Sequence, residues 1–254
     1  MPTPSPRALS EPEISQHTDH AWWPFSARLA AGWALLFLGC LALGWLVVDV
    51  LAATGIGRWD RQLPQQWEDA RTSTMNSWTQ LGSTAADTLF VIAVASFVGA
   101  LLLFLKRWTS TLFLVSALVL EVTVFSLTAL IIGRDRPDVE QMDVSPPTSS
   151  FPSGHTAAAT ALYVGLTVIV WWNFKSRAAV VASSLIAVLA VLAVGLSRIY
   201  RGMHHPTDVI AGVLLGLGCV LVAYFAVRAW VGGGQSKSTE AMESERVPAA
   251  EEMR

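Results

Sequence analysis

The sequence predicts an all-α integral membrane protein, built as a bundle of six transmembrane helices. Two observations carry this prediction. Of the 254 residues, 53% are hydrophobic and only 14% are charged, and the mean hydropathy of +0.48 is far too apolar for a soluble domain of this length. The chain also contains six apolar segments that, at 1.5 Å per residue, are each long enough to reach about 30 Å, the thickness of a hydrocarbon core.

The six predicted spans are residues 29–48, 88–105, 108–133, 156–174, 178–197 and 209–227. The first has a longer apolar run than a secretory signal peptide and follows a long polar stretch, so we interpret it as a span that is retained. The third contains Glu121, a costly charge at membrane depth. A proton-relay role and a protonated or paired carboxyl inside the bundle are both compatible with Glu121, and we do not assign it to the active site.

Residues 1–25 and 232–254 are rich in Ser, Pro, Glu and Ala and have no periodic apolar positions, which predicts disordered tails around a membrane domain at 26–231. The net charge of −2 and the composition of the tails give no indication of nucleic-acid binding. Cys40 and Cys219 both fall inside spans, without CxxC or metal-ligand spacing, so we expect neither a disulfide framework nor a metal site.

The cations with no other evident role lie in four regions, at Arg7 and Arg28, Lys106 and Arg107, Lys175 and Arg177, and Arg228 and Lys237. The positive-inside rule places all four regions in the cytoplasm, and both termini with them. The three remaining loops then lie outside. The first of these, 55–87, mixes charges of both signs with three tryptophans, which predicts a short interfacial helix; it contains no motif that we assign to chemistry.

Four polar clusters fall at the outer ends of the later spans. Arg134 and Arg136 follow the third span, residues 152–155 precede the fourth, Ser197 and Arg198 end the fifth, and residues 204–208 begin the sixth. Because all four clusters lie on one side of the membrane, they can converge in a single extracytoplasmic active site.

His204 and Asp208 are four residues apart at the start of a helix, a spacing that puts both on one face. The carboxylate can then hold one imidazole nitrogen and leave the other free to attack an electrophile. A histidine that caps the helix, with Asp208 favouring its positive end, is the simpler alternative. His205 is the competing nucleophile, and its spacing of three argues against it.

The remaining motifs fit a phosphate in transit, which carries three charged equatorial oxygens. Ser153 and the N–H groups that follow it, including that of Gly154, can point at an anion from a helix N-terminus, and His155 can donate a proton to a leaving group. A plain helix cap is the alternative for Ser153. Arg134, Arg136 and Arg198 could each be snorkelling cations, but their clustering on the outer face favours phosphate binding.

These residues resemble the type 2 phosphatidic acid phosphatases, which share a core with vanadium haloperoxidases and glucose-6-phosphatase-like enzymes. The family signature is K-x6-R-P, then P-S-G-H, then S-R-x5-H-x3-D. The second part is complete at 152–155, and the third is complete from Ser197 to Asp208. The resemblance covers residues 81–228. In the first part, Arg136 and Pro137 are present, but Ala129 stands where the family has lysine.

The resemblance implies that His204 forms a phosphohistidine, that Asp208 orients it and that His155 is the acid. It also implies that Arg136, Ser153, Gly154 and Arg198 hold the phosphate, without a metal or other cofactor. For the missing lysine three explanations remain open: Arg134 takes its place, the substrate differs, or activity is reduced.

We therefore expect a membrane phosphatase that acts on a phosphomonoester or diphosphate of a lipid. Candidate substrates are a polyprenyl diphosphate, phosphatidylglycerol phosphate and phosphatidate, and the first is preferred only as a frequent role of the family in bacterial envelopes. The alternatives are a non-catalytic membrane protein or transporter that keeps the fold, and a vanadate-dependent haloperoxidase, which is disfavoured because those relatives are soluble.

Overall fold

The computed structural model describes residues 11–144, 148–174 and 176–251, with side chains placed within 22–231. The described chain is helical and contains no strand. The helices are α1 (Glu11–Trp45), α2 (Gly55–Asp69), α3 (Ser73–Thr84), α4 (Thr88–Phe104), α5 (Trp108–Ile132), α6 (Gly154–Asn173), α7 (Arg177–Tyr200) and α8 (Pro206–Glu251). The all-α prediction is confirmed. α1 and α8 reach into the expected tails, so their bounds differ from the expected domain limits.

The apolar helices fit a multi-pass membrane protein. Five segments are long and apolar enough to span a membrane: Trp22–Ala53, Trp108–Ile132, Gly154–Asn173, Arg177–Tyr200 and Pro206–Val231. The expected second span is α4, which has only 17 residues and passes the same test only together with α3, to which it is joined at a bend of 46°. The bundle therefore has six spans when α3 and α4 are taken as one broken span.

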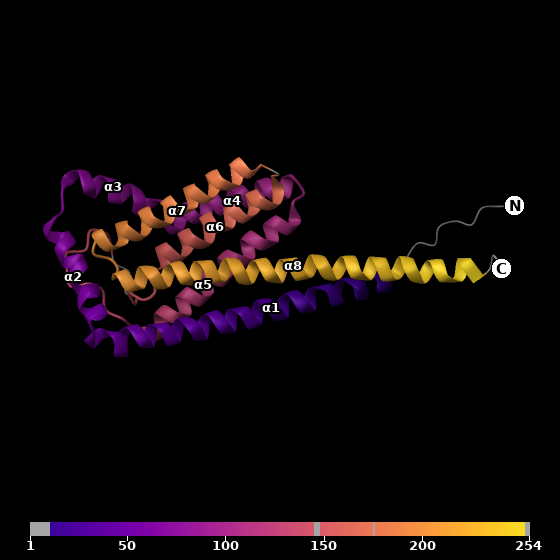
Figure 1. The fold of residues 1–254 in the computed structure, drawn as a ribbon, viewed down its shortest axis with the longest axis horizontal. Helices are drawn as coiled ribbons and strands as arrows, with labels where there is room; N and C mark the ends of the chain where they lie inside the picture. The colour runs from indigo at the N-terminus through magenta and orange to yellow at the C-terminus, as the bar shows by residue number, and fades with distance from the viewer. Residues whose placement is uncertain (1–10, 145–147, 175, 252–254) are drawn as a thin grey trace.

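In the bundle, α1 lies along α8 and α5, while α6 packs against α5, α7 and α8 (Figure 1). Phe113, Leu162 and Val227 are fully buried between the helices. By contrast, the side chains of Leu35 and Leu189 are more than 60% exposed. An apolar exterior around an apolar core is expected of helices that are surrounded by lipid.

The closest packing that bears on the site is between α8 and the start of α6. A Cβ atom on Gly212 would lie 2.5 Å from the Ser153 carbonyl oxygen, and one on Gly216 would lie 2.6 Å from that of Ala157. Glycines four residues apart allow two membrane helices to approach at backbone contact. This contact sets the start of α6 beside the first turn of α8, where the Ser153 N–H donates to the Asp208 carbonyl oxygen.

The segment 55–87 differs from its prediction. It forms two helices, α2 and α3, where a single interfacial helix was expected, and they cover one end of the bundle (Figure 1). Thr54 and Thr72 explain the two starts, because each hydroxyl accepts a hydrogen bond from an N–H in the following first turn. The loop between them, at residues 70–72, turns the chain.

Candidate active site

The four polar clusters meet at the end of the bundle that α2 and α3 cover. Backbone hydrogen bonds tie them together: Ser150 N–H donates to the Arg134 carbonyl oxygen, and Met203 N–H donates to that of Arg198. The charges of Arg198 and Arg136 both act on His204, and the charge of Arg198 also acts on His155. Residues separated by about seventy positions in the sequence are therefore close enough to form one site.

His204 is buried, with 4% of its surface exposed. Its Nδ1 atom lies 2.8 Å from the carbonyl oxygen of Ser150 and 3.8 Å from Oδ2 of Asp208. Because a carbonyl oxygen can only accept, Nδ1 carries the hydrogen and Nε2 keeps its lone pair. The nearest acceptor for His204 is therefore the Ser150 carbonyl oxygen, which no sequence motif indicated. The Asp208 carboxylate lies beyond hydrogen-bond distance.

Burial lowers the pKa of His204 below its ordinary value of 6.5. The negative charge of Asp208 opposes this shift in the pKa, while the charges of Arg198 and Arg136 add to it. The imidazole is therefore neutral at neutral pH. A neutral ring with Nδ1 protonated is the form that can attack through Nε2.

Asp208 is fully buried and accepts several hydrogen bonds. Its carboxylate accepts from Arg134, from the Ser150 hydroxyl and, at 2.8 Å, from the backbone N–H of His205. Nδ1 of His205 also lies 3.3 Å from Oδ2, closer than Nδ1 of His204. Asp208 thus holds the turn 204–208 and the Ser150 segment together, and reaches His204 mainly through Ser150.

Arg134 does not face an open anion site. One terminal nitrogen donates to Asp208 and, at 2.8 Å, to Oγ1 of Thr207, and the other donates to Asp60 of α2. Asp60 is 1% exposed and also accepts from the N–H and hydroxyl of Thr207, each at 2.8 Å. The guanidinium lies between two buried carboxylates, which is the geometry of a structural ion pair.

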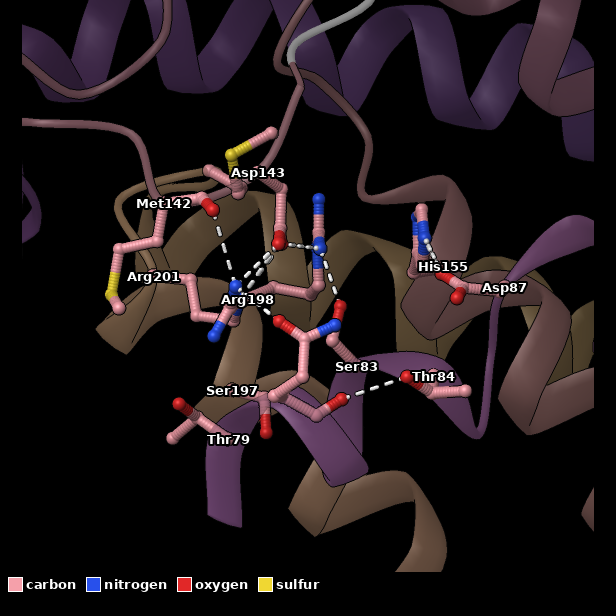
Figure 2. A network of polar contacts seen from close by, with 12 residues as sticks. Thr79, Ser83, Thr84, Asp87, Met142, Asp143, His155, Ser197, Arg198 and Arg201 are labelled. Carbon is pink, nitrogen blue, oxygen red and sulfur yellow. Dashed lines mark hydrogen bonds and ion pairs between the residues drawn. The ribbon is translucent and has the colours of Figure 1, made fainter. Parts of the chain in front are cut away.

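Arg198 is placed to bind an anion. One terminal nitrogen donates at 2.7 Å to Ser83 of α3 and to Asp143, while Nε is buried with no hydrogen-bond partner in the described chain. In Figure 2, one end of the guanidinium contacts Asp143 and Ser83, and the other end is free of dashed contacts. An unpaired buried donor is costly unless a ligand uses it.

The Asp143 carboxylate accepts hydrogen bonds from both Arg198 and Arg201 (Figure 2). Arg201 donates to the Asp143 carboxylate through Nε, at 2.9 Å, and through one terminal nitrogen. The same terminal nitrogen also donates to the side chain of Gln80 in α3. Burial alone would raise the pKa of Asp143, but these hydrogen bonds and charges outweigh burial and hold it below its ordinary range. The carboxylate therefore stays ionised and fixes Arg198.

His155 lies in the first turn of α6, where Nε2 is 3.3 Å from Oδ1 of Asp87, the residue before α4. Ser153 is fully buried, and its hydroxyl contacts that of Thr156 at 2.9 Å without capping the helix. The helix cap that was the alternative role of Ser153 is therefore absent, and the first N–H groups of α6, starting with that of Gly154, have no intrahelical acceptor. They remain available to an anion.

Arg136 donates at 2.7 Å to the Met203 carbonyl oxygen, next to His204. It also lines a cavity of about 420 Å³ between residues 47–52, which follow α1, the helix α2 and the loop after α5. His205 and Arg134 line the same cavity. Ala129 is buried on α5, so that position of the helix supplies no cation.

The structure adds site residues that sequence reasoning missed. Asp60, Ser83 and Asp87 come from segment 55–87, which carried no recognisable motif, and Asp143, Ser150 and Arg201 come from the loops after α5 and α7. The sequence signal for the charged members was only the presence of charges between the predicted spans. Charges in a loop do not by themselves predict which arginine or lysine a carboxylate will contact.

The chain is similar to known membrane phosphatases. A family model described as the PAP2 superfamily matches residues 110–231. Phosphatidylglycerophosphatase B of Bacillus subtilis is 31% identical over 153 residues, which cover 56% of this chain and 68% of that protein. Bacitracin transport permease protein BcrC of Bacillus licheniformis is 30% identical over 89 residues, which cover 35% of this chain and 39% of that protein.

Among solved structures, the chain resembles the crystal structure of a transmembrane PAP2-type phosphatidylglycerolphosphate phosphatase from Bacillus subtilis. The TM-score is 0.65, with 22% sequence identity over 79% of this chain and 96% of that one. At this identity the comparison supports the fold.

Proposed function

Because the chain belongs to the PAP2 superfamily of membrane lipid phosphatases, we propose that it removes phosphate from a lipid phosphomonoester or diphosphate through a phosphohistidine on His204. The observation that carries this proposal is the neutral imidazole of His204. Its Nδ1 hydrogen faces the Ser150 carbonyl oxygen, which leaves the lone pair of Nε2 free, and the charges of Arg198 and Arg136 act on the ring.

In the proposed first step, Nε2 of His204 attacks phosphorus and the bond to the leaving oxygen breaks. His155 gives its proton to that oxygen, and Nε2 of its ring lies 3.3 Å from the Asp87 carboxylate, which orients the ring. Arg136, the unpartnered edge of Arg198 and the free N–H groups at the start of α6 stabilise the equatorial oxygens. In the second step, His155 takes a proton from water, which attacks phosphorus and releases phosphate from His204.

The function is tested by measuring phosphate release by the purified chain on phosphatidylglycerol phosphate, phosphatidate and a polyprenyl diphosphate. The name of the relative phosphatidylglycerophosphatase B makes the first of these the reference substrate. We expect turnover with a chelator present and inhibition by vanadate, because arginines carry the oxyanion charge. Strict dependence on added magnesium would contradict the mechanism, and no turnover on any lipid would favour the non-catalytic alternative.

The acid limb of the pH profile reports the state of His204. Since burial lowers its pKa, kcat/KM is expected to stay level as pH falls to 6.5 and to decline only below that value. The unfolded chain takes up the proton that buried His204 resists, so stability also falls as pH drops below 6.5. An acid limb with a midpoint above 6.5 would exclude a neutral, buried nucleophile.

We also propose that this site faces the extracytoplasmic side, with Lys106, Arg107, Arg177 and Arg228 at the opposite, cytoplasmic end. Cys40 and Cys219 are buried and give little background labelling. In intact cells, an impermeant thiol reagent is expected to label Glu140→Cys, whose native side chain is 86% exposed, and to leave Ser176→Cys unlabelled until the membrane is opened. The reverse pattern would place the site in the cytoplasm.

A further inference from the structure

A second polar cavity lies at the end of the bundle opposite His204. Its volume is about 610 Å³, and it is bounded by the α4–α5 connection, the end of α6 and α8. Three of its lining residues are cations, Lys106, Arg107 and Arg228, and none of the lining residues is acidic. Lys106 has a φ of 56°, a left-handed conformation uncommon outside glycine.

Neutral donors add to these cations. α5 begins at Trp108 without a side-chain cap, and its first intrahelical bond is from Thr111 N–H to the Arg107 carbonyl oxygen. The N–H groups before Thr111 are therefore not used by the helix. The Ser110 hydroxyl accepts from the Asn173 amide at 2.9 Å, which leaves its own hydrogen free to donate.

The aromatic wall of the cavity holds a further unused donor. Trp172 packs against Phe113 and Tyr224, with ring centroids 5.0 and 5.6 Å apart, and its indole N–H is buried without a partner in the described part of the chain. Arg228 lies over the Tyr224 ring at 5.8 Å, which positions its charge at the rim. The three cations and the uncapped start of α5 are the groups at this cavity that favour binding of an anion.

We propose that this cavity binds the phosphate headgroup of an anionic phospholipid in the leaflet opposite the catalytic site. Trp108 and Phe104 beside it are exposed, at 63% and 83%, and offer apolar surface at headgroup depth for the acyl chains. The positive-inside rule accounts for cations at this end, but it requires neither the cavity nor the uncapped helix start beside it. The site is independent of the proposed catalytic function.

The test compares thermal unfolding of the full chain titrated with phosphatidylglycerol, phosphatidylcholine or inorganic phosphate. We expect saturable stabilisation by phosphatidylglycerol alone, with affinity weakened about tenfold in Arg228→Gln and further in Lys106→Gln/Arg228→Gln. Arg228→Lys should keep most of the effect. The matched control is Arg177→Gln, an exposed cation at the same end that does not line the cavity.

Equal stabilisation by phosphatidylglycerol and phosphatidylcholine would overturn the proposal, as would equal losses in Arg177→Gln and Arg228→Gln. If inorganic phosphate alone gave the full stabilisation, and the double variant lost it, the site would be one for free phosphate and the lipid assignment would be wrong. Phosphate release is measured in parallel, so failure of the catalytic proposal is seen separately.

Discussion

His204→Ala is expected to lower phosphate release by about four orders of magnitude or more while the protein remains folded, because the variant lacks the proposed nucleophile. His155→Ala is expected to lose about 10²- to 10⁴-fold, the usual contribution of a general acid. The measurement is kcat/KM of each purified variant on the best lipid substrate, with thermal unfolding as a check on folding.

The leaving group separates the two roles. An aryl phosphate, whose phenolate leaves without protonation, should restore much of the activity of His155→Ala and none of that of His204→Ala. His205→Ala is the matched control, and its loss of activity should be mild. His205 lies beside the proposed nucleophile, its Nδ1 atom is 3.3 Å from Asp208, and it lines the cavity of about 420 Å³ near Arg136. An inactive His205→Ala together with an active His204→Ala would exchange the roles of the two histidines.

Arg134→Ala is expected to cost about 3–5 kcal/mol of folding free energy, because it leaves Asp60 and Asp208 buried without their shared counterion. The measurement is the free energy of unfolding by denaturant in detergent. Arg61→Ala is the control, since this arginine of the same region donates only to the Ala52 carbonyl oxygen and is exposed. A double variant with Asp60→Asn should recover part of the loss.

The Arg134→Ala variant also tests whether Arg134 takes the place of the lysine that the family has at position 129. If Arg134 bound phosphate directly, Arg134→Ala would keep its stability, raise KM and be partly rescued by Ala129→Lys. The ion pairs with Asp60 and Asp208 favour loss of stability instead. Arg198, fixed by Asp143 and Ser83, is then the better-placed cation for the substrate.

Some features could be read directly from the sequence. Charge-free segments of sufficient length predict membrane helices because hydrocarbon excludes charges and unpaired backbone groups. The positions of Arg136, His155, Arg198 and His204 at the ends of those helices then require that they meet at one end of the bundle. Spacing within one turn, such as that of His204 and Asp208, is local and follows from helix geometry.

Only the tertiary structure decided which partner each polar group has. Ser150 and Asp143 lie in an irregular loop without periodicity, while Asp60 comes from α2 and Asp87 from the residue before α4, both far away in sequence. Whether such a residue meets a given cation depends on how helices pack, as in the close contact of Gly212 with the start of α6. Hydrogen bonds are short and directional, so spacing predicted that Asp208 would hold His204, whereas packing brought the Ser150 carbonyl oxygen nearer.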